Sequence, residues 1–323
     1  MRQLLALLSV PVLALGQAKT EAVFTFEIAN HAAYYDDGTG YAKTGTSTAM
    51  TPLPSDYVGV FRPYIWLGDL VAVNGAPAKG TLFMPGMALG GGPTPAPRYP
   101  IYDASRNQVA HAQLEILDSA GVHLGVLCFG MLGAGPSSPG GPRGAGAGAF
   151  TVVGGTGAFL GVSGQGGTVS HVGFRTASFM EDPALRRVNS SGKWVIRFLL
   201  AGLKRPEVVA AYHATEFTPV SAALPAREGE TVILAMRGMG PTRPSLEPDT
   251  VFAEEPLQTI AAEVVATVNG KPAVCLNAVG WPGTVDTYRV DVTLPSGFEA
   301  GKATVVVNRA YIPGIPFQLA VRQ

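Results

Sequence analysis

The sequence predicts an all-β protein with two domains. Apolar and polar residues alternate along many short segments, which is the period of half-buried strands. Glycine and proline contribute 41 and 26 of the 323 residues, a proportion typical of chains with many turns. Helical periodicity is almost absent, and the length suits two domains better than one.

The first residues, MRQLLALLSVPVLALGQAKT, have the pattern of a secretory signal peptide. Arg2 precedes an apolar stretch from Leu4 to Leu15, and Gly16 and Ala18 are small residues at the spacing that signal peptidase reads. The stretch is shorter than the roughly 20 apolar residues of a membrane span. We therefore expect residues 1–18 to be removed and the mature protein to be secreted, to the periplasm, the cell surface or the medium, with no membrane span.

The charge balance argues against nucleic-acid binding. Basic and acidic residues number 23 each, so the net charge is zero and nothing attracts a phosphate backbone. Neither the five histidines nor the two cysteines have the spacing of metal ligands, so we expect no metal and no cofactor. Cys128 and Cys275 are expected to be buried free thiols on strands of separate domains.

The segments that follow the signal peptide read as strands and tight turns. AVFTFEIAN is a strand in which Phe24, Phe26 and Ile28 share one face. GDLVAVNGAPAKGTLF is a hairpin with Asn74 and Gly75 at its turn, because this dipeptide favours the left-handed backbone of a two-residue hairpin loop.

The clearest hairpin is QVAHAQLEILDSAGVHLGVLCFGM, with a three-residue loop at Ser119–Gly121. A barrel wall needs one face buried, and the two faces of this hairpin differ in kind. One face is apolar and carries Ala112, Leu114, Ile116, Leu124, Val126 and Cys128. The other is mixed and carries His111, Gln113, Glu115, His123, Leu127 and Phe129.

The run TVVGGTGAFLGVSG could be a phosphate-binding loop or a bend in a sheet. Gly155 and Gly157 fit a dinucleotide motif, but the next glycine falls one place late, at Gly161. The residues that follow are rich in glycine and β-branched types and have no helical period. Without a helix N-terminus there is no site for a pyrophosphate, so we interpret the run as a corner between strands.

The extended run FTVVGGTGAFLGVSGQGGTV resembles the signature of the dirigent and allene oxide cyclase superfamily. GDLVAVNG and YPIYDASRNQVAHAQ are also similar to segments of that family, and the resemblance covers residues 24–203. It implies a short, eight-stranded antiparallel barrel over residues 19–204, often trimeric, with an apolar cavity for a small organic molecule. The implied structural glycines, with positive φ in at least one of the first three, are Gly154, Gly155, Gly157 and Gly161.

A second domain is expected over residues 205–323. TVILAMRG, TYRVDVTLP and KATVVVN are short strands at near-regular spacing, which favours a β-sandwich. RPEVVAAYHATEFTPVSAALPAREGETVILAMRGMGP resembles the opening of the Solibacter-type C-terminal domain, and the match continues over residues 206–323. The resemblance implies an immunoglobulin-like fold of the IPT/TIG type, acting as a spacer or attachment domain.

Candidate ligand-binding residues come partly from the same resemblance. Allene oxide cyclases place a glutamate and an asparagine on the first strand, facing the cavity; Glu27 and Asn30 lie there in this chain, one residue further apart. Because those relatives have polar groups in the cavity, we favour an inward mixed face, which adds His111, Gln113 and Glu115 to the candidates. The family's cysteine position has no matching residue, so no catalytic residue is assigned.

Three functions remain open at this point. The first is an exported barrel that binds a small apolar molecule. The second is a cofactor-independent cyclase or isomerase that acts by confining its substrate. The third is a structural surface protein whose barrel is filled with side chains.

Overall fold

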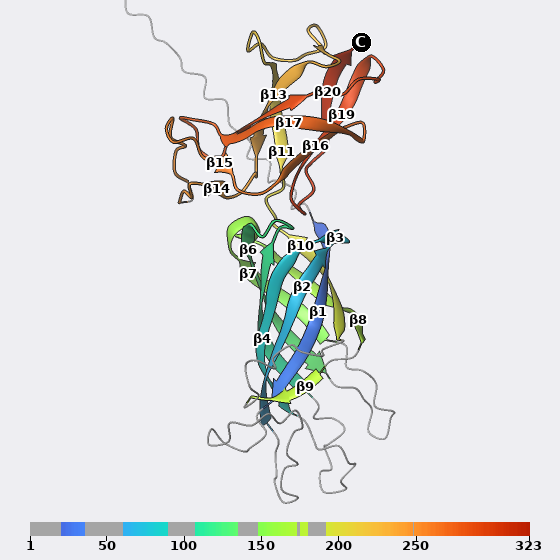
Figure 1. The fold of residues 1–323 in the computed structure, drawn as a ribbon, viewed down its shortest axis with the longest axis vertical. Coiled ribbons are helices and arrows are strands. Elements are labelled where there is room, and N and C mark those ends of the chain that lie inside the picture. The colour runs from blue at the N-terminus through green and yellow to red at the C-terminus, as the bar shows by residue number, and fades with distance from the viewer. Residues whose placement is uncertain are drawn as a thin grey trace, which may run out of the picture.

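The computed structural model describes residues 21–35, 61–89, 107–134, 148–172, 175–179, 192–247 and 249–323. These ranges contain strands, turns and one single-turn 3-10 helix, η1 (Gly157–Phe159), so the all-β prediction is confirmed. The predicted signal peptide lies outside the described residues. Figure 1 shows a barrel built from the first part of the chain and a second β domain beyond one of its ends.

The first sheet is a closed barrel of eight antiparallel strands, as predicted. Each strand pairs with the next, and the first strand pairs with both the second and the last, which closes the barrel. Two short strands, β3 (Ala76–Pro77) and β9 (Arg175–Ser178), extend it by pairing with β2 and β1. The eight are β1 (Ala22–Tyr35), β2 (Phe61–Val73), β4 (Lys79–Leu89), β5 (Asn107–Leu117), β6 (His123–Ala134), β7 (Gly148–Gly155), β8 (Ser163–Val172) and β10 (Lys193–Ala201).

The predicted turn at Asn74 and Gly75 is confirmed. Both residues have positive φ, 52° and 80°, and the flanking Val73 and Ala76 are paired, as in a type I′ hairpin. The side chain of Asn74 also accepts a hydrogen bond from the Thr25 amide at 2.8 Å, which ties the turn to β1.

The β5–β6 hairpin has the predicted loop, but a bulge changes which residues of β6 face inward. Leu117 pairs with His123 and Ile116 pairs with Gly125, so Leu124 is an extra residue on β6. One extra residue reverses the alternation of every side chain beyond it.

Because of the bulge, the faces of this hairpin differ from those expected. Leu127 and Phe129, expected on the mixed face, are buried in the barrel. Val126 and Cys128, expected on the apolar face, pair with Glu115 and Gln113 on the outer wall. The inner face is therefore uniformly apolar on both strands. Simple alternation of residues along the two strands, without a bulge, does not predict this.

The glycine run forms the predicted corner between β7 and β8. Gly157 and Gly161 have positive φ, 57° and 79°, whereas Gly155 does not. A Cβ on Gly157 would lie 2.4 Å from the Leu124 carbonyl oxygen, and one on Gly155 would lie 2.7 Å from Phe159. Close backbone approach therefore requires glycine here, and Gly154 also has positive φ, 154°.

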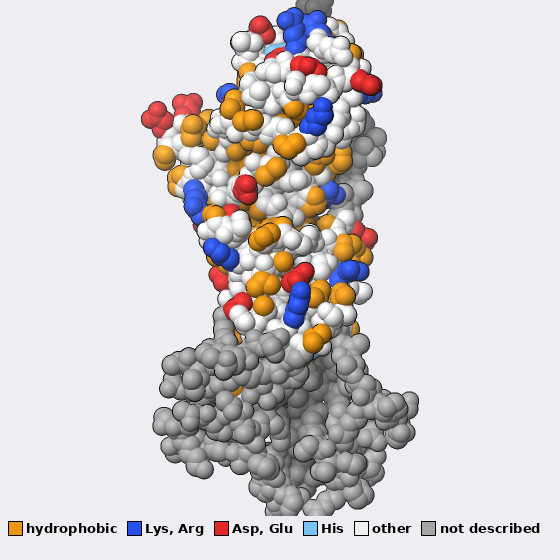
Figure 2. Space-filling view, turned by 45° about the vertical axis from the view of Figure 1, so that its right-hand side comes forward, with side chains coloured by type: hydrophobic (Ala, Val, Ile, Leu, Met, Phe, Trp, Pro, Cys, Tyr) orange, Lys and Arg blue, Asp and Glu red, His pale blue; other side chains and the backbone are white. Residues whose placement is uncertain are grey.

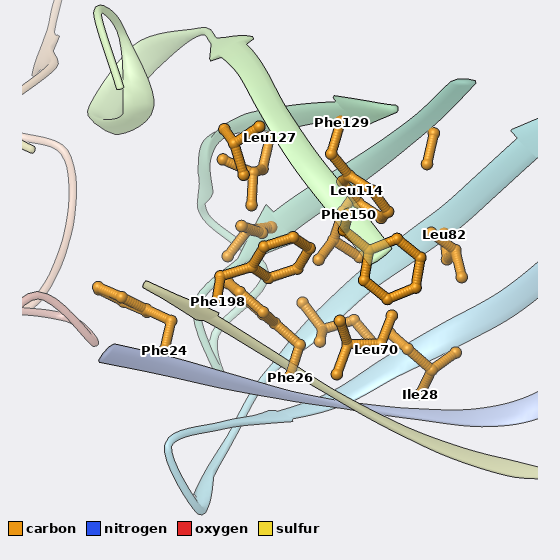
Figure 3. Packing of buried hydrophobic residues seen from close by; sticks show 14 of the residues in the cluster. Phe24, Phe26, Ile28, Leu70, Leu82, Leu114, Leu127, Phe129, Phe150 and Phe198 are labelled. Atoms are coloured by element: carbon orange, nitrogen blue, oxygen red, sulfur yellow. The ribbon is translucent and has the colours of Figure 1, made fainter. Parts of the chain in front are cut away.

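The barrel interior toward the second domain is filled by side chains. Phe129 and Phe198 have ring centroids 4.9 Å apart, and Phe26 lies 5.9 Å from Phe198. Figure 3 shows these rings and aliphatic side chains from several strands pointing toward one another. The labelled members of this cluster are Phe24, Phe26, Ile28, Leu70, Leu82, Leu114, Leu127, Phe129, Phe150 and Phe198.

The second sheet has its own apolar core and is nearly closed, which confirms a β domain; its immunoglobulin-like kinship stays a prediction. Its main path runs β11-β13-β18-β17-β16-β19-β20-β12, with β14 and β15 attached through β17. The strands are β11 (Glu207–His213), β12 (Ala226–Arg227), β13 (Thr231–Arg237), β14 (Thr242–Arg243), β15 (Thr259–Ile260), β16 (Val264–Val268), β17 (Lys271–Gly280), β18 (Tyr288–Thr293), β19 (Gly301–Arg309) and β20 (Phe317–Arg322).

The second domain packs on one end of the barrel. Ile312 is buried within the barrel's apolar cluster, and the Tyr311 hydroxyl donates to the Pro77 carbonyl at 2.7 Å. Arg205, in the connecting residues 202–206, donates to the carbonyls of Pro313 and Gly314. This end of the barrel is therefore covered.

Candidate functional site

The two candidate residues on β1 do not point into the barrel. Glu27 forms an ion pair with Lys193 on the neighbouring β10, with 2.7 Å between Oε2 and Nζ. Asn30 is exposed, and its amide donates to the Asp69 carboxylate at 2.8 Å. Both side chains therefore belong to the outer wall, where charged groups are scattered among hydrophobic ones (Figure 2).

The preference for an inward mixed face is wrong. His111 and Gln113 are exposed, and Glu115 is half-buried beside the exposed His123 at 3.9 Å. The alternate residues Ala112 and Leu114 are buried inside. Burying a carboxylate or an imidazole without partners costs free energy, whereas burying the apolar face releases it, so the barrel forms with the polar face outward.

The structure instead assembles a polar and aromatic group inside the barrel, at the end away from the second domain. We call it the histidine–tryptophan cluster; four strands contribute to it, and all its members except His171 are buried. It consists of His31 from β1, Tyr64 and Trp66 from β2, His171 from β8 and Trp194 from β10.

The centre of the cluster is a hydrogen bond between two histidines. His31 Nδ1 and His171 Nε2 lie 2.9 Å apart, although 140 positions separate the two residues in the chain. His31 has no exposed surface, whereas His171 is exposed at the end of β8. The pair therefore connects solvent to a fully buried imidazole.

Tryptophan rings surround this pair. The Trp194 ring stacks on His171 with 5.2 Å between centroids and lies 5.1 Å from His31. The Trp66 ring contacts His31 edge-on at 5.0 Å. Trp194 is itself held in place, because its Nε1 donates to Thr168 Oγ1 at 3.0 Å.

A bulge in β1 turns His31 inward. Ala29 pairs with Asp69 and Ala32 pairs with Leu67, so β1 has one residue more than β2 between these pairs. Asn30 adopts a left-handed backbone, with φ of 50°, and the alternation that buried Ile28 is reversed beyond it. Without the bulge, Asn30 would point inward and His31 outward.

Gly68 lies opposite this bulge and makes room for it. A Cβ at this position would approach Ile28 Cγ2 to 2.3 Å and the Ala29 carbonyl oxygen to 3.3 Å. Any other residue would push the two strands apart, so Gly68 and the bulge together position His31.

Burial keeps the histidine pair uncharged at neutral pH. Desolvation, with a smaller contribution from neighbouring His171, lowers the pKa of His31 to about 3. Desolvation also lowers the pKa of His171 from its ordinary value of 6.5. A neutral pair contains one ring nitrogen that donates the shared hydrogen bond and one that accepts it, so it can exchange a proton with a bound molecule.

Sequence reasoning missed this cluster because its members have no local pattern. The spacing of the five histidines matches no metal-binding motif, and in the described ranges no three metal-ligating side chains lie together. Gly68 next to Asp69 was visible in the sequence, but neither residue indicates a bulge on the partner strand.

Comparison of the chain with family models, with curated proteins and with solved structures found no match. The resemblances at both ends of the chain thus remain predictions. Within the ranges that the structure describes, no helix is long and apolar enough to cross a membrane.

Proposed function

We propose that the barrel binds a small, largely apolar organic molecule at the histidine–tryptophan cluster. The observation that carries the proposal is the His31–His171 pair, in which one ring is exposed and the other is fully buried among tryptophans. The exposed side of His171 is where a molecule that enters this end of the barrel would first make contact.

The contrast between the ends of the barrel supports this location. The end next to the second domain is filled by aliphatic and phenylalanine side chains and covered by Ile312. The other end contains three large aromatic rings with polar edges and two imidazoles. Sites for small molecules combine apolar walls with a few polar groups, and the described residues of the histidine–tryptophan cluster have that composition.

The cluster favours a planar or aromatic molecule with one polar group. Indole and phenol rings offer flat faces with large contact area, and stacked or edge-on packing against them is favourable. A neutral imidazole pair can donate to or accept from a single carbonyl or hydroxyl group. A strongly charged ligand fits less well, because the surrounding rings leave its charge poorly solvated.

A dye titration tests the proposal. N-phenyl-1-naphthylamine, a neutral aromatic probe, should bind saturably to the full-length protein and quench tryptophan fluorescence. We expect His171→Gln to weaken this binding about tenfold, which corresponds to one lost contact. The matched control, His111→Gln on the outer wall, should bind like the wild type; equal affinity of both variants would contradict the proposed site.

A cyclase or isomerase is the second candidate. The specific observation in its favour is the hydrogen bond between His31 and His171, which places a neutral imidazole pair inside an apolar barrel. If a molecule co-purifies with the protein, incubation followed by chromatography should show an isomer with the wild type and none with His171→Gln. Chromatograms that are identical for both proteins would count against catalysis while leaving binding intact.

A further inference from the structure

Three aromatic side chains of the second domain form a compact group at its surface, which we call the aromatic platform. Tyr212 on β11 and Phe217 in the following turn are stacked, with ring centroids 5.2 Å apart and an interplanar angle of 8°. Trp281, directly after β17, stands nearly perpendicular to both rings, at 6.4 Å from Tyr212 and 5.8 Å from Phe217.

One face of the Phe217 ring is open to solvent. Phe217 is 50% exposed, although Tyr212 covers one of its faces. The three centroid distances form a nearly equilateral triangle, so Trp281 lies beside the stacked pair and not on the far side of Phe217. Neither of the two other rings therefore covers the face of Phe217 that points away from Tyr212.

The backbone holds Phe217 in this position at an energetic cost. Its φ is 57°, a left-handed conformation that is uncommon for a bulky side chain. The turn is closed by hydrogen bonds from the Phe217 amide to the His213 carbonyl at 3.0 Å and from the His213 amide to the Thr218 carbonyl at 2.9 Å. A large apolar ring that is half exposed and held in an uncommon backbone conformation stabilises the fold less than a buried one, which points to a role in binding.

We propose that the aromatic platform binds a neutral polysaccharide of β-linked pyranose units. The faces of such sugars present C–H groups that pack against an open aromatic ring, and their edges present hydroxyl groups. Thr215 and Glu216 are exposed next to Phe217 and supply a hydroxyl and a carboxylate for those edges. A glycan site on this domain is independent of the ligand proposed for the barrel.

The arrangement of the rings favours a sugar over a proline-rich peptide. Grooves that bind polyproline helices have slots between aromatic side chains, into which the proline rings insert. Tyr212 and Phe217 are stacked in parallel with a lateral offset, 5.2 Å between centroids, which leaves no slot between them. They present one flat surface instead, which suits the face of a sugar ring.

Sedimentation of the full-length protein with insoluble polysaccharides tests this site. Amorphous cellulose, chitin and peptidoglycan sacculi share the β-linked backbone. Comparing them shows which of the three polysaccharides the domain binds. We expect the wild type to sediment with at least one of them, and Phe217→Ala or Trp281→Ala to weaken that binding about tenfold. The matched control is Leu276→Ala, which removes an exposed apolar side chain of β17 in the same domain and should leave binding unchanged.

A second variant separates binding from folding. Phe217→Gly removes the ring and also relieves the left-handed strain, so it should lose polysaccharide binding with an unchanged or higher melting temperature. Failure of the wild type to sediment with all three polysaccharides would overturn the proposal. Undiminished sedimentation of Phe217→Gly would also overturn it. A third contrary result would be that no polysaccharide binds but a deca-proline peptide does, seen as a change in Trp281 fluorescence.

Discussion

The two ends of the barrel interior differ in chemistry although the same strands build both. Near the second domain, Phe26, Phe129 and Phe198 pack against aliphatic side chains. At the other end, His31 and Trp194 occupy the inward positions. The first composition stabilises a barrel, whereas the second buries the His31 imidazole, whose polar atoms must be desolvated.

This difference indicates which end the fold depends on and which end is available for a ligand. Buried histidine contributes less to stability than an apolar residue of similar size, because its polar atoms must be desolvated. If the barrel served only as a structural core, replacing His31 with an apolar residue would make the protein more stable. We therefore expect substitutions of core residues to lower the free energy of unfolding strongly, and the contribution of the histidine pair to it to depend strongly on pH.

The largest effect is expected at Phe198. Its ring contacts Phe26, Phe129 and Phe150, and it has no exposed surface. Phe198→Ala should lower the free energy of unfolding by about 4 kcal/mol, because it removes buried surface and leaves a cavity. Urea unfolding measures this loss. The control is Leu199→Ala at the exposed neighbouring position, which should lower the free energy of unfolding by less than about 1 kcal/mol. Similar losses for both variants would mean that this end is not a packed core.

The next largest effect is a loss of stability in acid that depends on His31. In the unfolded chain His31 binds a proton near pH 6.5, whereas in the folded protein it stays neutral down to about pH 3. The unfolded state therefore binds more protons between these values, so the free energy of unfolding falls as the pH falls. Between pH 7 and pH 4.5 the contribution of His31 should be about 2.5 kcal/mol.

Urea unfolding at several pH values isolates this contribution. Between pH 7 and pH 4.5 the free energy of unfolding of the wild type should fall by about 2.5 kcal/mol more than that of His31→Gln, because the variant has no imidazole to protonate. His111→Gln, on the exposed wall, should follow the wild type throughout. A wild-type curve parallel to that of His31→Gln would show that the buried imidazole does not resist protonation.

A smaller effect distinguishes two glycines of the β7–β8 corner. Gly157 and Gly161 both have positive φ, but only Gly157 lacks space for a Cβ, which would lie 2.4 Å from the Leu124 carbonyl oxygen. Gly157→Ala should therefore cost about 2 kcal/mol, and Gly161→Ala, with no atom within 4 Å of its Cβ, about 1 kcal/mol. Thermal unfolding of the two variants measures these losses in stability. Equal losses would show that the strain comes from the backbone conformation alone.

The sequence was sufficient for the overall architecture. The alternation of Phe24, Phe26 and Ile28, the Asn74–Gly75 turn and the glycine run each have a local cause, so each could be recognised without the rest of the chain. The closed eight-stranded barrel followed from the resemblance of the glycine run, and the strand pairing confirms it.

The candidate site could not be predicted, because two bulges reverse the faces of strands. The bulge at Leu124 moves Leu127 and Phe129 inward, and the bulge at Asn30 does the same for His31. A bulge depends on the partner strand, as the clash expected at Gly68 shows, and a single strand's pattern does not contain that information. The expected sites at Glu27, His111 and Glu115 followed from the resemblance to relatives that have polar groups in the cavity, whereas the structure places all three side chains on the outer wall.

Native mass spectrometry of the full-length protein purified from its own host shows directly whether the barrel holds a small molecule. If the histidine–tryptophan cluster is a binding site, the wild type should carry one small organic molecule per chain that is released on unfolding. His171→Gln should carry less of it, and His111→Gln should carry as much as the wild type. An adduct that is retained equally by all three proteins, or no adduct on any of them together with no saturable dye binding, would contradict the account.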